Sequence, residues 1–282
     1  MSDAIDYLAI GHVAKDLTPD GWRLGGTVAY AALTVRAFGY TPGVVTSYGD
    51  DMDLSPVSAI SVSRVASPTT TTFENIYGPK GRTQYLHARA APLDYAAVPT
   101  SWRRAPVVHL APLAREVDTG LARSFAATGA LVGLTLQGWL REWDDDGRVR
   151  ARETWPEAGA VLPHAGAVVF SLEDVRGDWD LARSWAETTA VLVVTQGPRG
   201  CTVFARREAP RVFPAPAQAE VDPTGAGDIF AAAFFVTLHQ TGDPWVSAQL
   251  ANEVAARSIT RTGLEGVPTA EEVSMSQRRL LP

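Results

Sequence analysis

The fold is decided by residues 221–230, which read Val-Asp-Pro-Thr-Gly-Ala-Gly-Asp-Ile-Phe. A proline-rich segment precedes this stretch and an apolar run, residues 229–238, follows it, so the order predicts a strand or loop, a tight turn and then a helix. Gly225 and Gly227 let the backbone turn sharply and come close to a ligand. The free N–H groups at the helix N-terminus, together with the helix dipole, would then hold an anion.

Asp228 lies among these donors. A carboxylate in an anion site has a purpose if it accepts a proton, because a hydroxyl that attacks phosphorus needs a base on one side and an anion hole on the other. The alternative is structural: Asp228 caps the helix and the glycines only form the turn. For an isolated Gly-x-Gly-Asp the structural alternative is favoured, so the case for chemistry depends on the whole stretch.

Composition indicates a globular enzyme. Hydrophobic residues make up 46% of the 282 and charged residues 20%, which provides a full core and argues against disorder. The net charge of −6 does not suggest a nucleic-acid partner, although backbone amides and Mg²⁺ can still carry a phosphate site. Cys201 is the single cysteine, which excludes an internal disulfide and a cysteine zinc site. The lack of a basic N-terminal region and of a long apolar run predicts a cytoplasmic protein without a membrane partner.

Strands and helices alternate along most of the chain. Buried strands are predicted at residues 7–13, 43–47, 107–110, 131–136, 167–170 and 190–195, and helices at residues 28–38, 117–128, 157–162, 180–188, 228–240 and 244–260. This order predicts a single α/β domain over residues 1–282, with a Rossmann-like, mostly parallel central sheet and helices on both faces. Residues 137–152 are polar and rich in tryptophan, and they are predicted to form a loop.

Residues 60–90 follow a different pattern. Segments 61–65, 69–77 and 82–88 alternate polar and apolar side chains, and the turn Gly78-Pro79-Lys80-Gly81 joins the last two as a hairpin. Strands with one wet face are typical of a small sheet that projects from the main body, and we interpret it as a lid; an ordinary surface hairpin is an equal alternative. Such strands could cap a site alone or pair with a second subunit in a homodimer.

The full Asp-Pro-Thr-Gly-Ala-Gly-Asp-x-Phe stretch resembles the C-terminal signature of the ribokinase-like (PfkB) carbohydrate kinases, and the resemblance covers nearly the whole chain. It implies an ATP-dependent kinase that acts on a small-molecule sugar or polyol. It also implies that Asp228 is the catalytic base and that the amides of Gly225, Ala226 and Gly227 form the anion hole. Thr224 would then face the nucleotide phosphates.

The same resemblance implies an acceptor side. A first strand, then Asp16, then Gly25-Gly26 at a helix start match the order of the family. Asp16 would accept hydrogen bonds from substrate hydroxyls, and Gly26 would let the substrate approach closely. Without this context Asp16 would be a solvated loop acid. Tyr30 stands where ribokinase-like sequences often carry an Asn that reaches the sugar, which puts ribose in doubt and suggests another hydroxylated ring.

Two weaker matches imply the donor side. Thr195-Gln196-Gly197-x-x-Gly200 resembles the Thr-x-Gly segment that contacts the nucleotide in the family, although such a turn can simply end a strand. Asn252 falls where the family lines the adenine pocket, and it could equally be a residue of a helix surface.

Residues 171–174, Ser-Leu-Glu-Asp, stand where many members of the family have Asn-x-x-Glu, which organises Mg²⁺ and phosphate through water. Asp174 and the adjacent Glu173 keep a carboxylate available for a hydrated Mg²⁺. The alternative is that the segment only caps the next helix. A K⁺ ion near Asp222 is implied by the resemblance alone.

Four features are similar to the myo-inositol kinase branch of the family: the spacing from Gly25 to Tyr30, the acidic turn at residues 48–51, Gln137 after a strand, and Ser-x-Glu-Asp at residues 171–174. They imply myo-inositol or a similar polyol as the substrate, with Gln137 among the residues that bind it. Another sugar, such as fructose, or a nucleoside stays open.

Two other classes compete with a kinase. A nucleotide- or sugar-binding protein without catalysis is supported only by the altered segment 171–174. A dinucleotide-dependent oxidoreductase is disfavoured because Gly11-His12-Val13 supplies no Gly-x-Gly-x-x-Gly turn after the first strand. Serine hydrolase chemistry lacks a Gly-x-Ser-x-Gly elbow.

Overall fold

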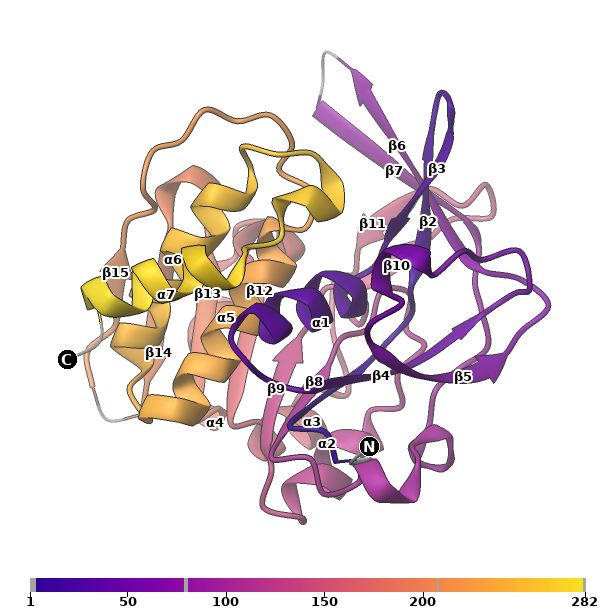
Figure 1. Ribbon diagram of the computed structural model, residues 1–282. Coiled ribbons are helices and arrows are strands. Elements are labelled where there is room, and N and C mark those ends of the chain that lie inside the picture. Colours follow the sequence, from indigo (N-terminus) through magenta and orange to yellow (C-terminus); the bar gives the residue numbers. More distant parts are fainter. Residues whose placement is uncertain (1–3, 79–80, 207, 281–282) are drawn as a thin grey trace.

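The structure, a computed structural model, describes residues 4–78, 81–206 and 208–280. Within these residues the chain forms a nine-stranded central sheet in the order β15-β14-β13-β12-β9-β8-β1-β4-β5 (Figure 1). Its strands are β1 (Tyr7–Ile10), β4 (Pro42–Tyr48), β5 (Ser61–Ala66), β8 (Val107–Leu110), β9 (Leu131–Thr135), β12 (Ala167–Ser171), β13 (Val191–Thr195), β14 (Cys201–Ala205) and β15 (Arg211–Phe213). The strands from β13 to β5 are parallel, whereas β14 and β15 continue the sheet antiparallel. The predicted mostly parallel sheet is confirmed.

Helices cover both faces of this sheet (Figure 1). One layer contains α1 (Thr27–Ala37), α5 (Ala226–Thr241), α6 (Pro244–Ser258) and α7 (Ala270–Leu280), and the other contains α2 (Gly120–Ala126), α3 (Ala158–Val161) and α4 (Trp179–Thr188). Side chains of β1 alternate between the layers, as a strand requires: Tyr7 and Ala9 pack in the first, Leu8 and Ile10 in the second. None of the helices within the described residues is long and apolar enough to cross a membrane.

Helix α5 is the centre of the first layer. Its residues from Ile229 to Leu238 are all buried, which explains the continuous apolar run in the sequence. It contacts α1, α6 and the strands β8, β9 and β12. A helix held on all sides presents its N-terminus as a fixed point, and the turn at residues 221–228 leads into that end.

A second, four-stranded sheet has the order β3-β2-β6-β7 within the described residues, and we call it the lid. It consists of β2 (Ala14–Thr18), β3 (Gly21–Gly25), β6 (Thr71–Gly78) and β7 (Gly81–Ala88), and it projects from the body (Figure 1). The hairpin predicted from segments 69–77 and 82–88 is confirmed, although Pro79 and Lys80 of its turn lie outside the described residues.

The extent predicted for the lid is wrong in two respects. Segment 61–65 forms β5, which pairs with β4 at the edge of the central sheet. An edge strand also has one wet face, so it alternates like a lid strand. Conversely, β2 and β3 belong to the lid, although neither carries that pattern. Pairing of the strands of residues 60–90 with a second subunit stays a prediction.

The segment predicted as a loop, residues 137–152, also contains two short strands. β10 (Arg141–Trp143) and β11 (Val149–Ala151) pair antiparallel, and β11 contacts β7 of the lid. The hairpin therefore lies between the lid and the body.

Candidate active site

Gly225 begins α5 in a left-handed conformation, with φ at +81°. This conformation favours glycine, and the available space requires it, because a Cβ on Gly225 would lie 2.2 Å from Cε1 of Tyr30. Tyr30 comes from α1 and is 2% exposed, so its ring forms the floor of the turn. The turn and α1 are fitted to each other, and Tyr30 presents little surface for the substrate contact predicted for it.

Asp222 holds the turn from its other side. Its Oδ1 accepts a hydrogen bond from the Thr224 amide at 2.9 Å, and its Oδ2 accepts one from the Gly263 amide at 3.0 Å. Burial acts to raise the pKa of Asp222, but these hydrogen bonds outweigh it and the pKa lies below its ordinary value. Both carboxylate oxygens thus contact backbone donors, and a K⁺ ion beside them stays a prediction.

The predicted anion hole lies at the first turn of α5. The first amides of a helix have no partner within it, but the Ala226 amide already donates to the Pro223 carbonyl at 3.2 Å. The amides of Gly225 and Gly227 are therefore the better placed donors of the three that the sequence suggested.

Asp228 also lies in the first turn of α5, and charges from three distant parts of the chain act on it. Burial raises the pKa of Asp228 to about 6. A hydrogen bond from Thr27 and the positive charge of Arg141 act to lower it, whereas the carboxylates of Asp16 and Asp174 raise it. A carboxylate with such a pKa is mostly ionised at neutral pH and is still basic enough to take a proton.

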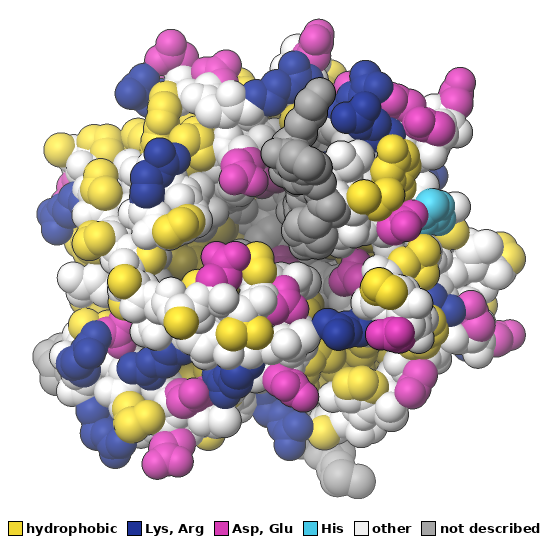
Figure 2. Space-filling view, turned by 90° about the horizontal axis from the view of Figure 1, so that it is seen from above, with side chains coloured by type: hydrophobic (Ala, Val, Ile, Leu, Met, Phe, Trp, Pro, Cys, Tyr) yellow, Lys and Arg dark blue, Asp and Glu magenta, His cyan; other side chains and the backbone are white. Residues whose placement is uncertain are grey.

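Viewed from the lid side, the molecule is hollowed near its centre, and acidic side chains lie around the hollow (Figure 2). The charge of Asp16 acts on Asp228, although Asp16 belongs to the lid and Asp228 to the body.

Two glycines place Asp16. A Cβ on Gly25, in the strand next to Asp16, would lie 2.0 Å from Oδ2 of Asp16, so Gly25 makes room for this carboxylate. Gly26 has φ at +98°, and a Cβ there would lie 2.5 Å from the carbonyl oxygen of His12. Gly26 thus lets the backbone of the chain itself come close, and the approach of a substrate there stays a prediction.

Asp174 caps the 3₁₀-helix η5 (Leu172–Val175). Its Oδ2 accepts from the Ser171 amide at 2.9 Å, and Oγ of Ser171 accepts from the exposed Glu173 at 3.2 Å. Within the described residues no group of three His, Cys, Asp or Glu side chains could hold a metal ion alone. The charge of Asp174 nevertheless reaches Asp228, and one carboxylate beside phosphates suits a Mg²⁺ ion that keeps most of its water.

The donor side predicted from the sequence is a turn after β13. Thr195 donates through Oγ1 to the Phe170 carbonyl at 3.3 Å. Gly197 and Gly200 have φ at +58° and +87°. A cavity of about 370 Å³ opens between this turn and η5. It is lined by Ser171, Leu172, Glu173, Arg176, Gly177, Thr195, Gln196 and Arg199.

The remaining two predicted site residues are placed differently. Asn252 is 5% exposed, and its Nδ2 donates to the Phe213 carbonyl at 3.0 Å and lies 3.6 Å from Sγ of Cys201. The amide group thus ties α6 to β14 and β15, and its place in an adenine pocket stays a prediction. Gln137 is half-buried just after β9, and its contact with a substrate stays a prediction.

Known proteins resemble the chain over this whole architecture. Residues 167–270 match the pfkB family of carbohydrate kinases. The sulfate complex of a pyrophosphate-dependent kinase in the ribokinase family superposes with a TM-score of 0.80, covering 95% of this chain and 99% of that one at 21% identity. The matching segment includes the turn and Asp228, and the fold of the chain is that of a ribokinase-family kinase.

Further known proteins resemble the chain. Ribokinase of Arabidopsis thaliana, complexed with ribose and ATP, superposes with a TM-score of 0.72 over 97% of this chain and 98% of that one, at 18% identity. Cytidine kinase of Thermococcus kodakarensis is 28% identical over 247 residues, which are 82% of this chain and 87% of that protein. Inositol 3-kinase of Oryza sativa subsp. japonica is 27% identical over 291 residues, covering 95% of this chain and 70% of that protein.

Sequence reasoning missed two residues of this candidate site. Thr27, at the start of α1, donates a hydrogen bond to Asp228. Arg141 lies on β10, where its Nη1 donates to the Leu113 carbonyl at 3.4 Å and its guanidinium lies 5.5 Å from the ring of Phe73 in the lid. A three-residue strand in a polar segment has too little periodicity to be found, so no local signal marks Arg141.

Proposed function

We propose that this chain is a kinase that transfers the γ-phosphoryl group of ATP to a hydroxyl of a polyol or sugar, with myo-inositol or a similar polyol as the acceptor. The observation that carries the proposal is Asp228, a carboxylate with a pKa of about 6 in the first turn of α5. It adjoins the left-handed turn at Gly225, where helix amides can hold an anion. A base beside an anion hole is the apparatus that attack on phosphorus requires.

Each group of the site has a task in this reaction. Asp228 takes the proton from the attacking hydroxyl, and the amides of Gly225 and Gly227 hold charge on the transferred group. Arg141 adds a positive charge close to the same place, as its effect on Asp228 indicates. A Mg²⁺ ion, when bound through water near Asp174, would neutralise the donor phosphates.

The acceptor is proposed from the chemistry of Asp16. A carboxylate can accept two hydroxyl hydrogen bonds, which suits neighbouring hydroxyls of a cyclic polyol. Similarity to inositol 3-kinase over 95% of the chain supports this choice. Similarity to cytidine kinase over 82% of the chain supports a nucleoside as the second candidate.

The donor also has two candidates. Similarity to a ribokinase complexed with ATP supports ATP, whereas similarity to a pyrophosphate-dependent kinase supports pyrophosphate. Asn252 supplies no argument for adenine, because its amide group is committed to Phe213. The test must therefore vary the donor as well as the acceptor.

The experiment measures formation of phosphorylated product with myo-inositol, fructose, ribose and cytidine, each with ATP or pyrophosphate and Mg²⁺. We expect turnover with ATP on a polyol and a loss of roughly 10²–10⁴-fold in Asp228→Asn, the usual contribution of a general base. Asp6→Asn is the matched control, since Asp6 precedes β1 at the opposite end of the sheet and its carboxylate bonds only the Thr41 amide in the contacts observed.

The outcomes separate the candidates. Turnover by Asp228→Asn close to that of the wild type would show that Asp228 is not the base. Binding of ATP without turnover on any acceptor would instead favour a non-catalytic binding protein.

A further inference from the structure

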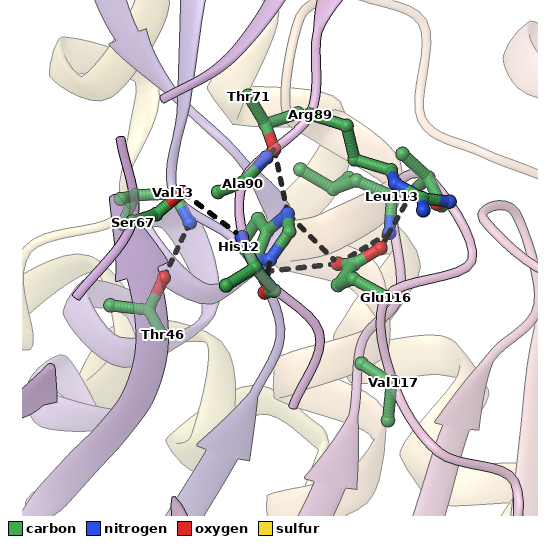
Figure 3. A network of polar contacts seen from close by, with 12 residues as sticks. His12, Val13, Thr46, Ser67, Thr71, Arg89, Ala90, Leu113, Glu116 and Val117 are labelled. Carbon is green, nitrogen blue, oxygen red and sulfur yellow. Dashed lines mark hydrogen bonds and ion pairs between the residues drawn. The ribbon is translucent and has the colours of Figure 1, made fainter. Parts of the chain in front are cut away.

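A buried polar cluster joins the lid to the body (Figure 3). His12, which links β1 to β2, is fully buried. Its Nε2 donates to the Ala91 carbonyl at 2.8 Å, and its Nδ1 lies 2.6 Å from Oγ1 of Thr71. The same Oγ1 accepts from the Ala90 amide at 3.0 Å. Because Thr71 begins β6 and Ala90 follows β7, one imidazole ring ties together the places where three lid strands meet the body.

Glu116 fastens the backbone of His12 to the loop after β8. It is 2% exposed, and its Oε1 accepts from the His12 amide at 3.0 Å. The carboxylate also accepts from the Leu113 amide at 2.9 Å and from the Ala114 amide at 2.7 Å. Arg115, inside this loop, has φ at +59°, an uncommon conformation for a residue with a side chain. A buried carboxylate with three backbone donors can hold such a loop in place.

The loop in turn supports β10. The Leu113 carbonyl accepts from Arg141, and the guanidinium of Arg115 lies 4.2 Å from the ring centre of Trp143 on the same strand. Glu116 is therefore connected to two of the three charged groups that act on Asp228: to Asp16 through His12 and β2, and to Arg141 through Leu113.

We propose that Glu116, His12 and Thr71 are positioning residues, which fix the base of the lid and thereby set the places of Asp16 and Arg141 around Asp228. The inference rests on the proposed kinase function. Glu116, His12 and Thr71 act through other residues: Asp16 is on β2, four positions after His12 in the chain. A fully satisfied buried network of this kind has one low-energy arrangement, so removal of one member loosens the others.

Two substitutions test the cluster, each with a matched control. Thr71→Val keeps the branched shape but removes the hydroxyl that contacts both His12 and Ala90; Thr72→Val changes the next residue of β6, whose hydroxyl bonds only the Thr70 carbonyl in the contacts observed. Glu116→Gln replaces a carboxylate oxygen by an amide group that faces backbone donors. Its control, Glu142→Gln, makes the same change at the exposed position of β10.

The first readout is hydrogen exchange of residues 14–25 and 71–88 without ligands. The second is KM and kcat for the acceptor and for the donor. We expect Thr71→Val and Glu116→Gln to speed exchange in these segments and to raise the acceptor KM roughly tenfold, as loss of one or two buried hydrogen bonds predicts. The donor KM should stay within about twofold, because the donor side does not depend on the lid, and the controls should match the wild type.

Unchanged exchange in both variants would overturn the proposal whether or not the protein turns over substrate. Faster exchange with an acceptor KM and kcat equal to the controls would also overturn it, since the cluster would then only stabilise the lid. A wild-type chain without turnover on any acceptor would refute the kinase function itself, and the exchange data would then decide alone whether the cluster fixes the lid.

Discussion

Gly225→Ala is the substitution whose effect the structure defines best. A Cβ at this position would lie 2.2 Å from Cε1, 2.4 Å from Cδ1 and 2.7 Å from Cζ of Tyr30. The left-handed conformation of a residue with a side chain costs about 1–2 kcal/mol, and overpacking of a buried site costs about 1–3 kcal/mol more. If the turn stays in place, we expect the free energy of unfolding to fall by about 2–5 kcal/mol.

The turn can instead move to relieve the overlap. Relief requires a shift of about 1 Å, and a misplacement of that size can lower kcat/KM roughly 10²-fold. Stability and activity therefore report on the two responses separately. Urea denaturation measures the first, with an unchanged m-value as evidence that the variant unfolds in the same way. Turnover on the best acceptor measures the second.

Two controls isolate the contact with Tyr30. Gly129 has φ at +84° and no atom within 4 Å of an added Cβ, so Gly129→Ala should cost only the backbone term of about 1–2 kcal/mol and leave activity intact. In a Tyr30→Leu background the overlap disappears, and Gly225→Ala should then cost no more than Gly129→Ala. A Gly225→Ala variant as stable as Gly129→Ala and fully active, or a double-mutant cycle with no coupling, would refute the fit between the turn and α1.

Three further predictions follow from the pKa shifts. First, kcat/KM should fall about tenfold per pH unit below pH 6, because Asp228 acts as a base only when ionised and its pKa is about 6; a profile flat down to pH 4.5 would contradict this. Second, Asp228→Asn should stabilise the fold above pH 7 by up to about 3 kcal/mol while lowering turnover roughly 10²–10⁴-fold, since the raised pKa means that ionisation opposes folding; chemical denaturation at pH 5 and pH 8 checks the sign, as the gain should shrink at the lower pH. Third, burial lowers the pKa of His109 to about 3 between Tyr7 and Thr135, so the unfolded chain binds a proton that the folded chain excludes. Stability should therefore fall between pH 6.5 and pH 3, by about 5 kcal/mol at the lower limit, and His109→Leu should make this fall less steep.

The turn and helix around Asp228 could be predicted because their signals are local. The glycines, the acid and the apolar run are consecutive in the sequence. In the structure Gly225 takes the left-handed turn, Asp228 lies in the first turn of α5 and the apolar run is buried. Helix α1, which follows Gly26, could also be predicted because its signals are local. Helix α7 was missed because its short amphipathic segment follows the last clear pattern, and only its packing against α6 gives it a partner.

The lid could be predicted only in part, because a strand pattern reports exposure and says nothing of the partner. β5 and β6 both alternate, yet one is the edge of the central sheet and the other belongs to the lid. β2 contains Lys15 and Asp16 in place of alternating apolar residues, and it is a strand because β3 and β6 pair with it on both sides. Pairing between distant segments is a tertiary property, which overrides weak local propensity.

The strength of the proposed base illustrates the same limit at the level of chemistry. A motif of ten residues identifies Asp228, but an isolated Asp has an ordinary pKa near 4 and is about a hundredfold weaker as a base than one with a pKa of about 6. Burial is the largest cause of the raised pKa. Thr27 and Arg141 act to lower the pKa, and the carboxylates of Asp16 and Asp174 act together with burial to raise it. These residues come from the lid, η5, α1 and β10, so none of them could be weighed before the fold had brought them together. A local motif thus predicts which residue is the candidate base, while the tertiary structure sets the pKa of that residue.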